Sequence, residues 1–351
     1  MSGPDDDWAR RQAARAYLAT TDWAAARVEA LPADASFRRY FRLHGGPAPA
    51  LLMDAPPGPE DIGPFVDVAG HLIALGFSAP RVFGHDRARG FALVEDLGDE
   101  TFSRIIARGA AIEPLYALAV DVLAALHRHP RAAAVAVPDY STDLLAAEAA
   151  LLADWYLAAQ DEAEAARLRG DHLALWHQVL ADLPATAPTL VLRDFHVDNL
   201  MRLDGREGVG ACGLLDFQDA VIGPPAYDLM SLLQDARRDV PETLAAAMRE
   251  RYFRAVPVAD RAAFDRATAV LAAQRHAKVA GIFVRLWARD GKAPYLAHIP
   301  RVIRLLGRAL SHPALAELKR LLGPALARPP PDFDARTAAR LKAADREITA
   351  L

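Results

Sequence analysis

The sequence predicts an α+β fold of two lobes, a small antiparallel sheet with one inserted helix followed by a larger, mainly helical lobe. Three observations predict it. Short alternating or aromatic stretches between residues 36 and 95 are separated by turn residues, as strands of a small sheet are. One stretch without breakers, from about Asp61 to Leu75, interrupts them and predicts a helix closed by Gly76. After Gly98 most of the pattern is helical.

The elements of the N-terminal lobe, residues 1–97, are expected in the following order. Residues 8–30 are rich in alanine and arginine, contain no breaker and predict a first helix. Strands are expected at Phe37–Leu43, Ala50–Asp54, Arg81–Gly84 and Phe91–Glu95, with turns at His44–Pro47 and His85–Gly90. A hinge is predicted near Glu95–Gly98, where the sheet ends.

The C-terminal lobe, residues 98–351, is predicted to be helical except between Thr189 and Phe217. There, Leu190–Leu192 form a buried apolar strand, and a hairpin is expected around Asp204–Gly205, within residues 199–217. Helices are expected at Glu113–His127, Asp143–Ala159, Ala165–Ala181, Tyr227–Asp235, Glu242–Ala255, Arg261–Arg289, Tyr295–Ala309 and Arg336–Leu351.

Composition excludes several classes of protein. The 351 residues are 52% hydrophobic and 25% charged, which is typical of a globular protein with ample chain for a core. The net charge of −4 and the lack of a basic block argue against binding to nucleic acid or to an anionic membrane. Cys212 is the only cysteine, which excludes an internal disulfide. The acidic start, Met1–Asp7, has no apolar signal core, so we expect a cytoplasmic protein, and no protein partner is inferred.

One segment combines the residue types that phosphoryl transfer requires. The loop of residues 192–199 follows the buried strand and enters the hairpin, which ends in Asp216 and Phe217. The spacing matches the catalytic-loop and metal-binding signatures of protein kinases. Mg²⁺ prefers oxygen ligands, so the Asn199 amide and the Asp216 carboxylate are expected to bind it. Asp194 is expected to orient an acceptor hydroxyl and to accept its proton.

These residues and their surroundings resemble the aminoglycoside phosphotransferase/choline kinase branch of the protein-kinase-like fold. Leu93–Gly98 is similar to the hinge of that branch, and Gly223–Leu229 is similar to its segment after the metal-binding aspartate. The resemblance implies ATP and Mg²⁺ as cofactors and an adenine bound by hinge backbone near Glu95 and Leu97. It also implies that Asp228, together with the loop residue Arg193, supports the catalytic loop.

Finer features resemble one subgroup of that family. They are Ala35–Arg42, Met53–Pro57 and Gly281–Leu286, which are similar to segments of bacterial kinases that act on N-acetylmuramate and N-acetylglucosamine. The resemblance implies a small-molecule amino sugar as substrate. It also implies that ATP phosphorylates the anomeric C1 hydroxyl during peptidoglycan recycling.

The chain departs from the kinase pattern where the phosphate-binding lysine is expected. That strand reads Leu51-Leu52-Met53-Asp54, and the first of the four lysines is Lys278. Arginine also binds phosphate strongly, so Arg42 is the first candidate to replace the lysine, followed by Arg38 and Arg39. Ser36 is expected to contact phosphates as well. Leu192 in place of histidine and Gln218 in place of glycine are further departures.

The sequence leaves the acceptor and the activity open to alternatives. Candidates for contact with the sugar are His196, Asp219 and Arg237. One alternative is a kinase for aminoglycosides or choline-like amino alcohols, which would require an acidic pocket. Another is a catalytically inactive, nucleotide-binding pseudokinase, which the missing lysine favours. The intact set of Asp194, Asn199 and Asp216 favours an active enzyme instead.

Overall fold

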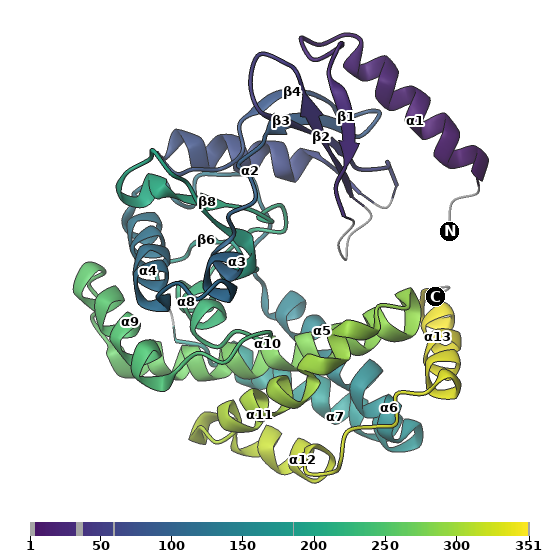
Figure 1. Ribbon diagram of the computed structural model, residues 1–351. Helices are drawn as coiled ribbons and strands as arrows, with labels where there is room; N and C mark the ends of the chain where they lie inside the picture. The colour runs from purple at the N-terminus through teal and green to yellow at the C-terminus, as the bar shows by residue number, and fades with distance from the viewer. Residues whose placement is uncertain (1–3, 33–37, 59, 185, 350–351) are drawn as a thin grey trace. The chain divides into compact units, whose positions relative to one another are not determined.

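The computed structural model describes residues 4–32, 38–58, 60–184 and 186–349 (Figure 1). The chain divides into two compact units. The first comprises residues 1–138 and 192–221, and the second comprises residues 139–191 and 222–351. This division groups residues 98–138 and the hairpin with the sheet, whereas the sequence predicts lobes at 1–97 and 98–351, and that boundary stays a prediction.

The first unit contains the small antiparallel sheet predicted from the sequence. Its five strands are β1 (Arg27–Ala30), β2 (Arg39–His44), β3 (Ala50–Asp54), β4 (Val82–Asp86) and β5 (Phe91–Glu95), in the order β1-β2-β3-β5-β4. Leu43 pairs with Ala50, and Leu52 pairs with Leu93. These residues pack with Tyr17 and its neighbours in one core cluster, so helix α1 (Pro4–Leu18) is held against the sheet (Figure 1).

The predicted first helix over residues 8–30 is wrong beyond Leu18. Helix α1 ends there, and residues 27–30 form the edge strand β1. The Thr20 and Thr21 hydroxyls donate hydrogen bonds to the carbonyl oxygens of Tyr17 and Leu18, at 2.7 and 2.9 Å. Such side-chain bonds compete with the helical backbone pattern. The Trp23 indole then donates to the Ala48 carbonyl at 3.1 Å and anchors the turn on the sheet.

The predicted hairpin is present in the first unit, with shorter strands than expected. It consists of β7 (Leu200–Arg202) and β8 (Cys212–Leu214), which are antiparallel, preceded by a 3-10 turn at Val197–Asn199. The Ser78 carbonyl accepts a hydrogen bond from the Leu214 amide at 2.7 Å, which ties the hairpin to the segment before β4. The remaining helices of this unit are α2 (Gly63–Ala74), α3 (Phe102–Ala107) and α4 (Ile112–Arg128), of which α3 was not predicted.

The second unit is built around one long helix, α10 (Arg261–Asp290) (Figure 1). Buried residues extend over most of its length. The predicted helix over 143–159 contains a π-helical turn at Leu152–Leu157. The helix at Ala316–Leu326 and the strand at Val221–Gly223 were not predicted. A short strand pair, β6 (Thr189–Val191) with β9 (Val221–Gly223), completes the secondary structure. The other helices are α5 (Thr142–Leu151), α6 (Ala158–Gln160), α7 (Glu162–Ala181), α8 (Ala226–Leu233), α9 (Glu242–Ala255), α11 (Ile299–Ala309), α12 (Ala316–Leu326) and α13 (Ala335–Thr349).

Two features hold α5 against α10. A Cβ atom on Gly281 would lie 2.2 Å from the Leu151 carbonyl oxygen, so glycine is required for this close approach. One turn along α10, Lys278 Nζ lies 2.7 Å from Glu148 Oε1, and both side chains are buried. The Tyr140 hydroxyl donates to the other Glu148 oxygen at 2.6 Å. The buried carboxylate is therefore neutralised and hydrogen-bonded, as a buried charge must be.

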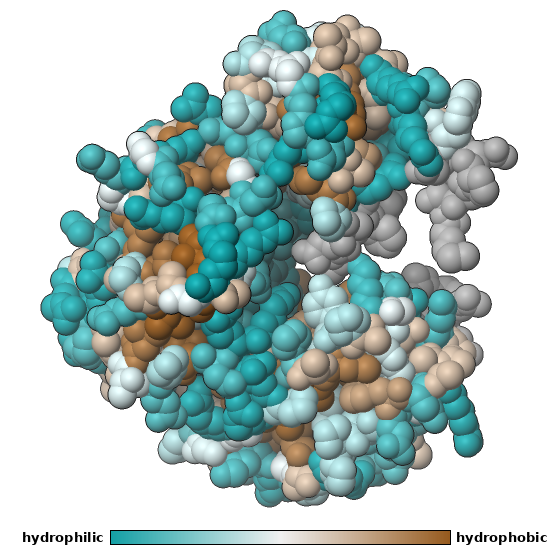
Figure 2. All heavy atoms as spheres, in the orientation of Figure 1, coloured by the Kyte–Doolittle hydropathy of each residue, from teal (hydrophilic) through white to brown (hydrophobic). Residues whose placement is uncertain are grey.

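Hydrophilic side chains cover most of the molecular face drawn in Figure 2, and hydrophobic ones gather in scattered patches. Among the described residues, large exposed hydrophobic side chains are few, and Trp8, at 65% exposure, is the most exposed of them. No helix within the described ranges has the length and apolar character needed to cross a membrane.

Three histidines are held in their uncharged form because the surrounding protein removes water from their rings. Burial lowers the pKa of His127 and of His276 to about 3 and the pKa of His172 to about 4. His172 Nε2 lies 2.7 Å from the Trp176 indole nitrogen, which donates its proton to the ring. A protonated ring could not accept this bond at Nε2.

We expect the free energy of unfolding to fall as the pH decreases from 6.5 toward 4. In this range an unfolded chain binds protons at the histidines, whereas the folded chain does not, and each site contributes about 1 kcal/mol per pH unit. His172→Gln keeps an acceptor for Trp176 and removes one titrating group, so its stability should depend less steeply on pH. Urea unfolding at pH 7, 6 and 5 measures both slopes, and equal slopes would contradict the assignment.

Candidate active site

A cavity of about 450 Å³ lies in the first unit, lined by the sheet, the hinge segment (Glu95–Gly98) and the hairpin. Its apolar lining includes Leu51 and Val94 from the sheet, and Met201 and Leu215 from the hairpin. Its polar lining includes Tyr40, Arg42, Glu95, Asp96, Asp198, Asn199 and Asp216. The volume is typical of sites for small ligands, and a lining that combines apolar and charged side chains suits a flat base that carries a charged tail.

Two of the three residues predicted to carry the chemistry, Asn199 and Asp216, line this cavity, and the backbone of Asp194 contacts Asn199. The Asn199 side-chain amide donates to the Asp194 carbonyl oxygen at 2.9 Å and to Asp216 Oδ2 at 3.4 Å. The backbone carbonyl oxygen of Asn199 accepts a hydrogen bond from the Leu215 amide at 3.0 Å, which joins the two arms of the hairpin. One side chain therefore contacts both the loop that carries Asp194 and the arm that carries Asp216.

The electrostatics of this cluster favour a cation. Removal of water by the surrounding protein and the nearby negative charge of Asp194 both raise the pKa of Asp216. The Asp216 carboxylate and the Asn199 amide oxygen are hard donors, which fit Mg²⁺ when water and phosphate complete its coordination. Within the described ranges, no three His, Cys, Asp or Glu side chains are grouped so as to hold a metal ion by themselves. Two protein donors suit a metal that is shared with a phosphorylated ligand.

The backbone is strained at the two positions that define the site. Arg193 has φ of 66° and Asp216 has φ of 58°, and in the described part of the chain these are the non-glycine residues with positive φ. This region is unfavourable for residues other than glycine, and such strain is found most often at functional sites. The Arg193 guanidinium donates to the Asp219 carbonyl at 3.0 Å, and the Gln218 amide donates to Asp216 Oδ1 at 3.0 Å. These bonds hold the strained turns in place.

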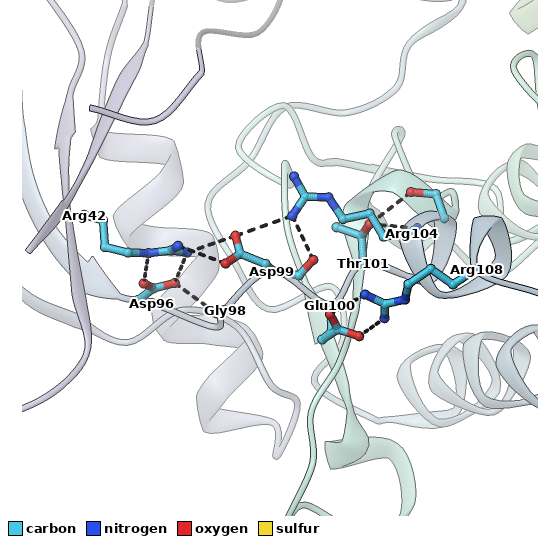
Figure 3. A network of polar contacts seen from close by, with 9 residues as sticks. Arg42, Asp96, Gly98, Asp99, Glu100, Thr101, Arg104 and Arg108 are labelled. Atoms are coloured by element: carbon cyan, nitrogen blue, oxygen red, sulfur yellow. Dashed lines mark hydrogen bonds and ion pairs between the residues drawn. The ribbon is translucent and has the colours of Figure 1, made fainter. Parts of the chain in front are cut away.

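Arg42 lies in the cavity wall and joins β2 to the segment that follows β5 (Figure 3). Its guanidinium lies 2.6 and 3.2 Å from the Asp96 oxygens and 2.9 and 3.1 Å from the Asp99 oxygens. These carboxylates raise the pKa of Arg42, and Arg42 lowers the pKa of Asp99. Asp96 also accepts a hydrogen bond from the Gly98 amide at 2.9 Å. The predicted role of Arg42 in nucleotide binding stays a prediction.

Glu95 anchors the hairpin to the hinge segment through a residue that the sequence analysis missed. Arg206, in the hairpin loop, lies 2.7 Å from Glu95 Oε1 and donates to the Ser78 hydroxyl at 2.9 Å. The other Glu95 oxygen accepts from the Arg81 backbone amide at 3.2 Å. No local pattern marks Arg206, because its partners lie more than a hundred residues away in the sequence.

The remaining predicted site residues lie in different places. His196 is buried, and its Nδ1 lies 3.6 Å from Asp198 Oδ2 beside the cluster. Ser36 lies outside the described residues. Arg237 and Asp228 belong to the second unit, where the Arg237 guanidinium lies 5.7 Å from the centre of the Phe283 ring and Asp228 is fully buried. Their predicted roles toward the sugar and the catalytic loop stay predictions.

Comparison with known proteins places these observations in a family. A sequence model described as "Phosphotransferase enzyme family" matches residues 27–269. The chain is 37% identical to the N-acetylmuramate/N-acetylglucosamine kinase of Caulobacter vibrioides, over 88% of this chain and 95% of that protein. It is 40% identical to the protein of the same name from Pseudomonas aeruginosa, over 84% of this chain and 88% of that protein.

A solved structure supports the fold. The structure of a choline/ethanolamine kinase family protein from Mesorhizobium loti matches with a TM-score of 0.60 and 16% identity. The match covers 90% of this chain and 99% of that one. At this identity the likeness bears on the fold alone, and it confirms the kinase-like fold class predicted from the sequence.

We expect Arg206→Ala to lower the free energy of unfolding by about 1–2 kcal/mol, because the partly buried Glu95 carboxylate and the Ser78 hydroxyl lose their donor. Backbone amides of the hinge segment should exchange faster with solvent. Arg202→Ala is a matched control in the same hairpin, since Arg202 is exposed and its ion pair with the exposed Asp204 at 3.9 Å should contribute little. Urea unfolding and hydrogen exchange measure both variants, and equal effects would refute the anchoring role.

Proposed function

Because the chain belongs to the phosphotransferase enzyme family, we propose that it transfers a phosphoryl group from ATP to the anomeric C1 hydroxyl of N-acetylmuramate and N-acetylglucosamine. The names and the extent of similarity of its two relatives support this acceptor. The observation that carries the proposal is the convergence of Asp194, Asn199 and Asp216 beside one cavity. Recycling of cell-wall amino sugars in the cytoplasm is the corresponding physiological role.

Asp194 is the proposed catalytic base. Its carboxylate orients the acceptor hydroxyl and takes the proton as the oxygen attacks phosphorus, a contribution of roughly 10²–10⁴-fold. The Asn199 amide, by donating to the Asp194 carbonyl at 2.9 Å, keeps this loop in position. The strained backbone at Arg193 fits the same purpose, because it turns the chain directly before Asp194.

Asn199 and Asp216 are the proposed ligands of Mg²⁺. The amide has its oxygen left for a metal when its nitrogen donates to Asp194, and the Asp216 carboxylate lies at 3.4 Å from that same nitrogen. When bound, Mg²⁺ neutralises charge on the phosphates of ATP. Two ligands on adjacent hairpin arms hold this position without a dedicated protein cage.

The cavity wall suits an adenine nucleotide. Leu51 and Val94 offer an apolar surface for the base, next to the hinge backbone of Glu95 and Leu97 that is proposed to hydrogen-bond its edge. The ion pairs of Arg42 with Asp96 and Asp99 fix the shape of this part of the cavity wall. Ser36 is proposed to contact the phosphates, as the sequence predicts.

The sugar is proposed to contact His196, Asp219 and Arg237. An N-acetylmuramate acceptor carries a lactyl carboxylate, and a guanidinium recognises such a group with two parallel hydrogen bonds. Arg237 is the proposed donor for this group. His196 is buried, and its Nε2 lies 3.4 Å from the Asn199 amide nitrogen. This closeness to the cluster supports its proposed contact with the sugar.

We expect Asp194→Asn to reduce kcat by about 10²–10⁴-fold while ATP still binds, because the base is lost and both metal ligands remain. Asp204→Asn, in the exposed turn of the hairpin, is the charge-matched control and should retain activity. ADP release measures turnover, and calorimetry measures ATP affinity. Near-normal turnover by Asp194→Asn would disprove the assignment of the base.

An acceptor panel tests the substrate class. We expect ATP consumption with N-acetylmuramate and N-acetylglucosamine, and phosphorus NMR should show the phosphate on C1. Consumption with aminoglycosides or choline alone would show that the acceptor has been assigned to the wrong class. Binding of ATP with no turnover of any acceptor would identify a pseudokinase.

A further inference from the structure

We propose that Arg38 is the cation that holds the phosphates of the bound nucleotide, in the place of the lysine that kinases carry, and that Glu60 positions it. The inference rests on the proposed nucleotide site. A triphosphate brings several negative charges, which kinases balance with metal ions and one lysine. No lysine occurs in this chain before Lys278, so the first unit contains none. An arginine must therefore take this role.

Two of the three candidate arginines are committed to structural contacts. Arg39 Nη2 lies 2.7 Å from Asp54 Oδ2, and Asp54 is buried and also contacts Arg10 at 2.6 Å. Arg42 binds Asp96 and Asp99 through four short contacts. Release of either guanidinium would remove short ion pairs from two largely buried carboxylates, Asp54 in the sheet and Asp96 in the hinge segment, which is costly.

Arg38 has a different environment. Its Nε lies 3.5 Å from Glu60 Oε2, and its Nη2 lies 3.8 Å from Asp216 Oδ1. Both distances are longer than hydrogen bonds, so these contacts are ion pairs. The Arg38 side chain is only 10% exposed, and that of Glu60 only 16%. The guanidinium is thus held in a largely buried place beside Asp216.

The position of Arg38 is the one that the chemistry requires. Asp216 is a proposed Mg²⁺ ligand, and the phosphates that share that metal must approach the same carboxylate. Tyr40, which lines the cavity, shares a side-chain hydrogen bond with Arg38. Glu60 precedes helix α2 and lies 3.5 Å from the same guanidinium. A carboxylate that holds a cation next to the metal site is the arrangement by which kinases position their lysine.

Guanidinium geometry suits this substitution. Arginine binds two phosphate oxygens at once, whereas lysine acts as a point charge. Arg38 therefore needs no exact match to the position of a lysine on β3, and it can reach the phosphates from the residue before β2. This assignment reverses the order expected from the sequence, in which Arg42 stands first.

The test compares ATP and adenosine as ligands of the full chain in the presence of Mg²⁺, with no acceptor added. In Arg38→Ala, we expect the affinity for ATP to fall by about tenfold or more while that for adenosine stays within about twofold, because only the phosphates lose a partner. Arg38→Lys should recover part of the ATP affinity. Glu60→Gln should weaken ATP binding in the same direction and by less. Calorimetry gives all affinities, and thermal melting checks that each variant is folded.

Arg39→Ala is the matched control, since it removes the same charge from the neighbouring residue. It should lower stability through Asp54, which keeps Arg10, and should leave the ratio of ATP to adenosine affinity unchanged. An unchanged ratio in both Arg38→Ala and Arg38→Lys, or a larger change of this ratio in Arg42→Ala, would overturn the proposal. Because no acceptor is present, this result is independent of whether amino sugars prove to be the substrates.

Discussion

The candidate site depends on one side chain, Asn199, and on the hydrogen bonds that fix it. Its amide nitrogen donates to the Asp194 carbonyl oxygen at 2.9 Å and to Asp216 Oδ2 at 3.4 Å, while the backbone carbonyl oxygen of Asn199 accepts from the Leu215 amide. These hydrogen bonds link the loop before the hairpin to the arm that carries Asp216. The positive φ values of Arg193 and Asp216 are tolerated only because such contacts over-determine both turns.

Arginine carries out several distinct tasks around this junction. Arg206 ties the hairpin loop to Glu95, and Arg42 ties β2 to the segment after β5, both through short contacts with carboxylates. Arg38 lies 3.5 Å from Glu60 and 3.8 Å from Asp216, and we propose that it binds the phosphates of the nucleotide. The planar, permanently charged fork of arginine allows both uses, whereas lysine would serve the structural pairs less well.

The local pattern of the sequence was sufficient to predict β2, β3, β4 and β5 and most helices, because alternation and turns are properties of neighbouring residues. Motif spacing also selected Asp194, Asn199 and Asp216, whose roles stay predictions. The same local pattern failed at β1, because a composition rich in alanine and arginine predicts a helix there. In the structure the Thr20 and Thr21 hydroxyls bond the last helical carbonyls, and the helix ends at Leu18. The local pattern also could not assign partners to the arginines. The contacts between Arg206 and Glu95 and between Arg42 and Asp96 join residues far apart in the chain, and only the folded structure determines them.

The central claim is that Asn199 and Asp216 together hold the metal of a bound nucleotide, with Asp194 beside it. A crystal structure with Mg²⁺ and a non-hydrolysable ATP analogue tests it most directly. The account predicts a metal at about 2.0–2.1 Å from the Asn199 amide oxygen and an Asp216 carboxylate oxygen, with phosphate oxygens completing its coordination. A metal–nucleotide complex held by other side chains, with Asn199 and Asp216 uninvolved, would contradict it.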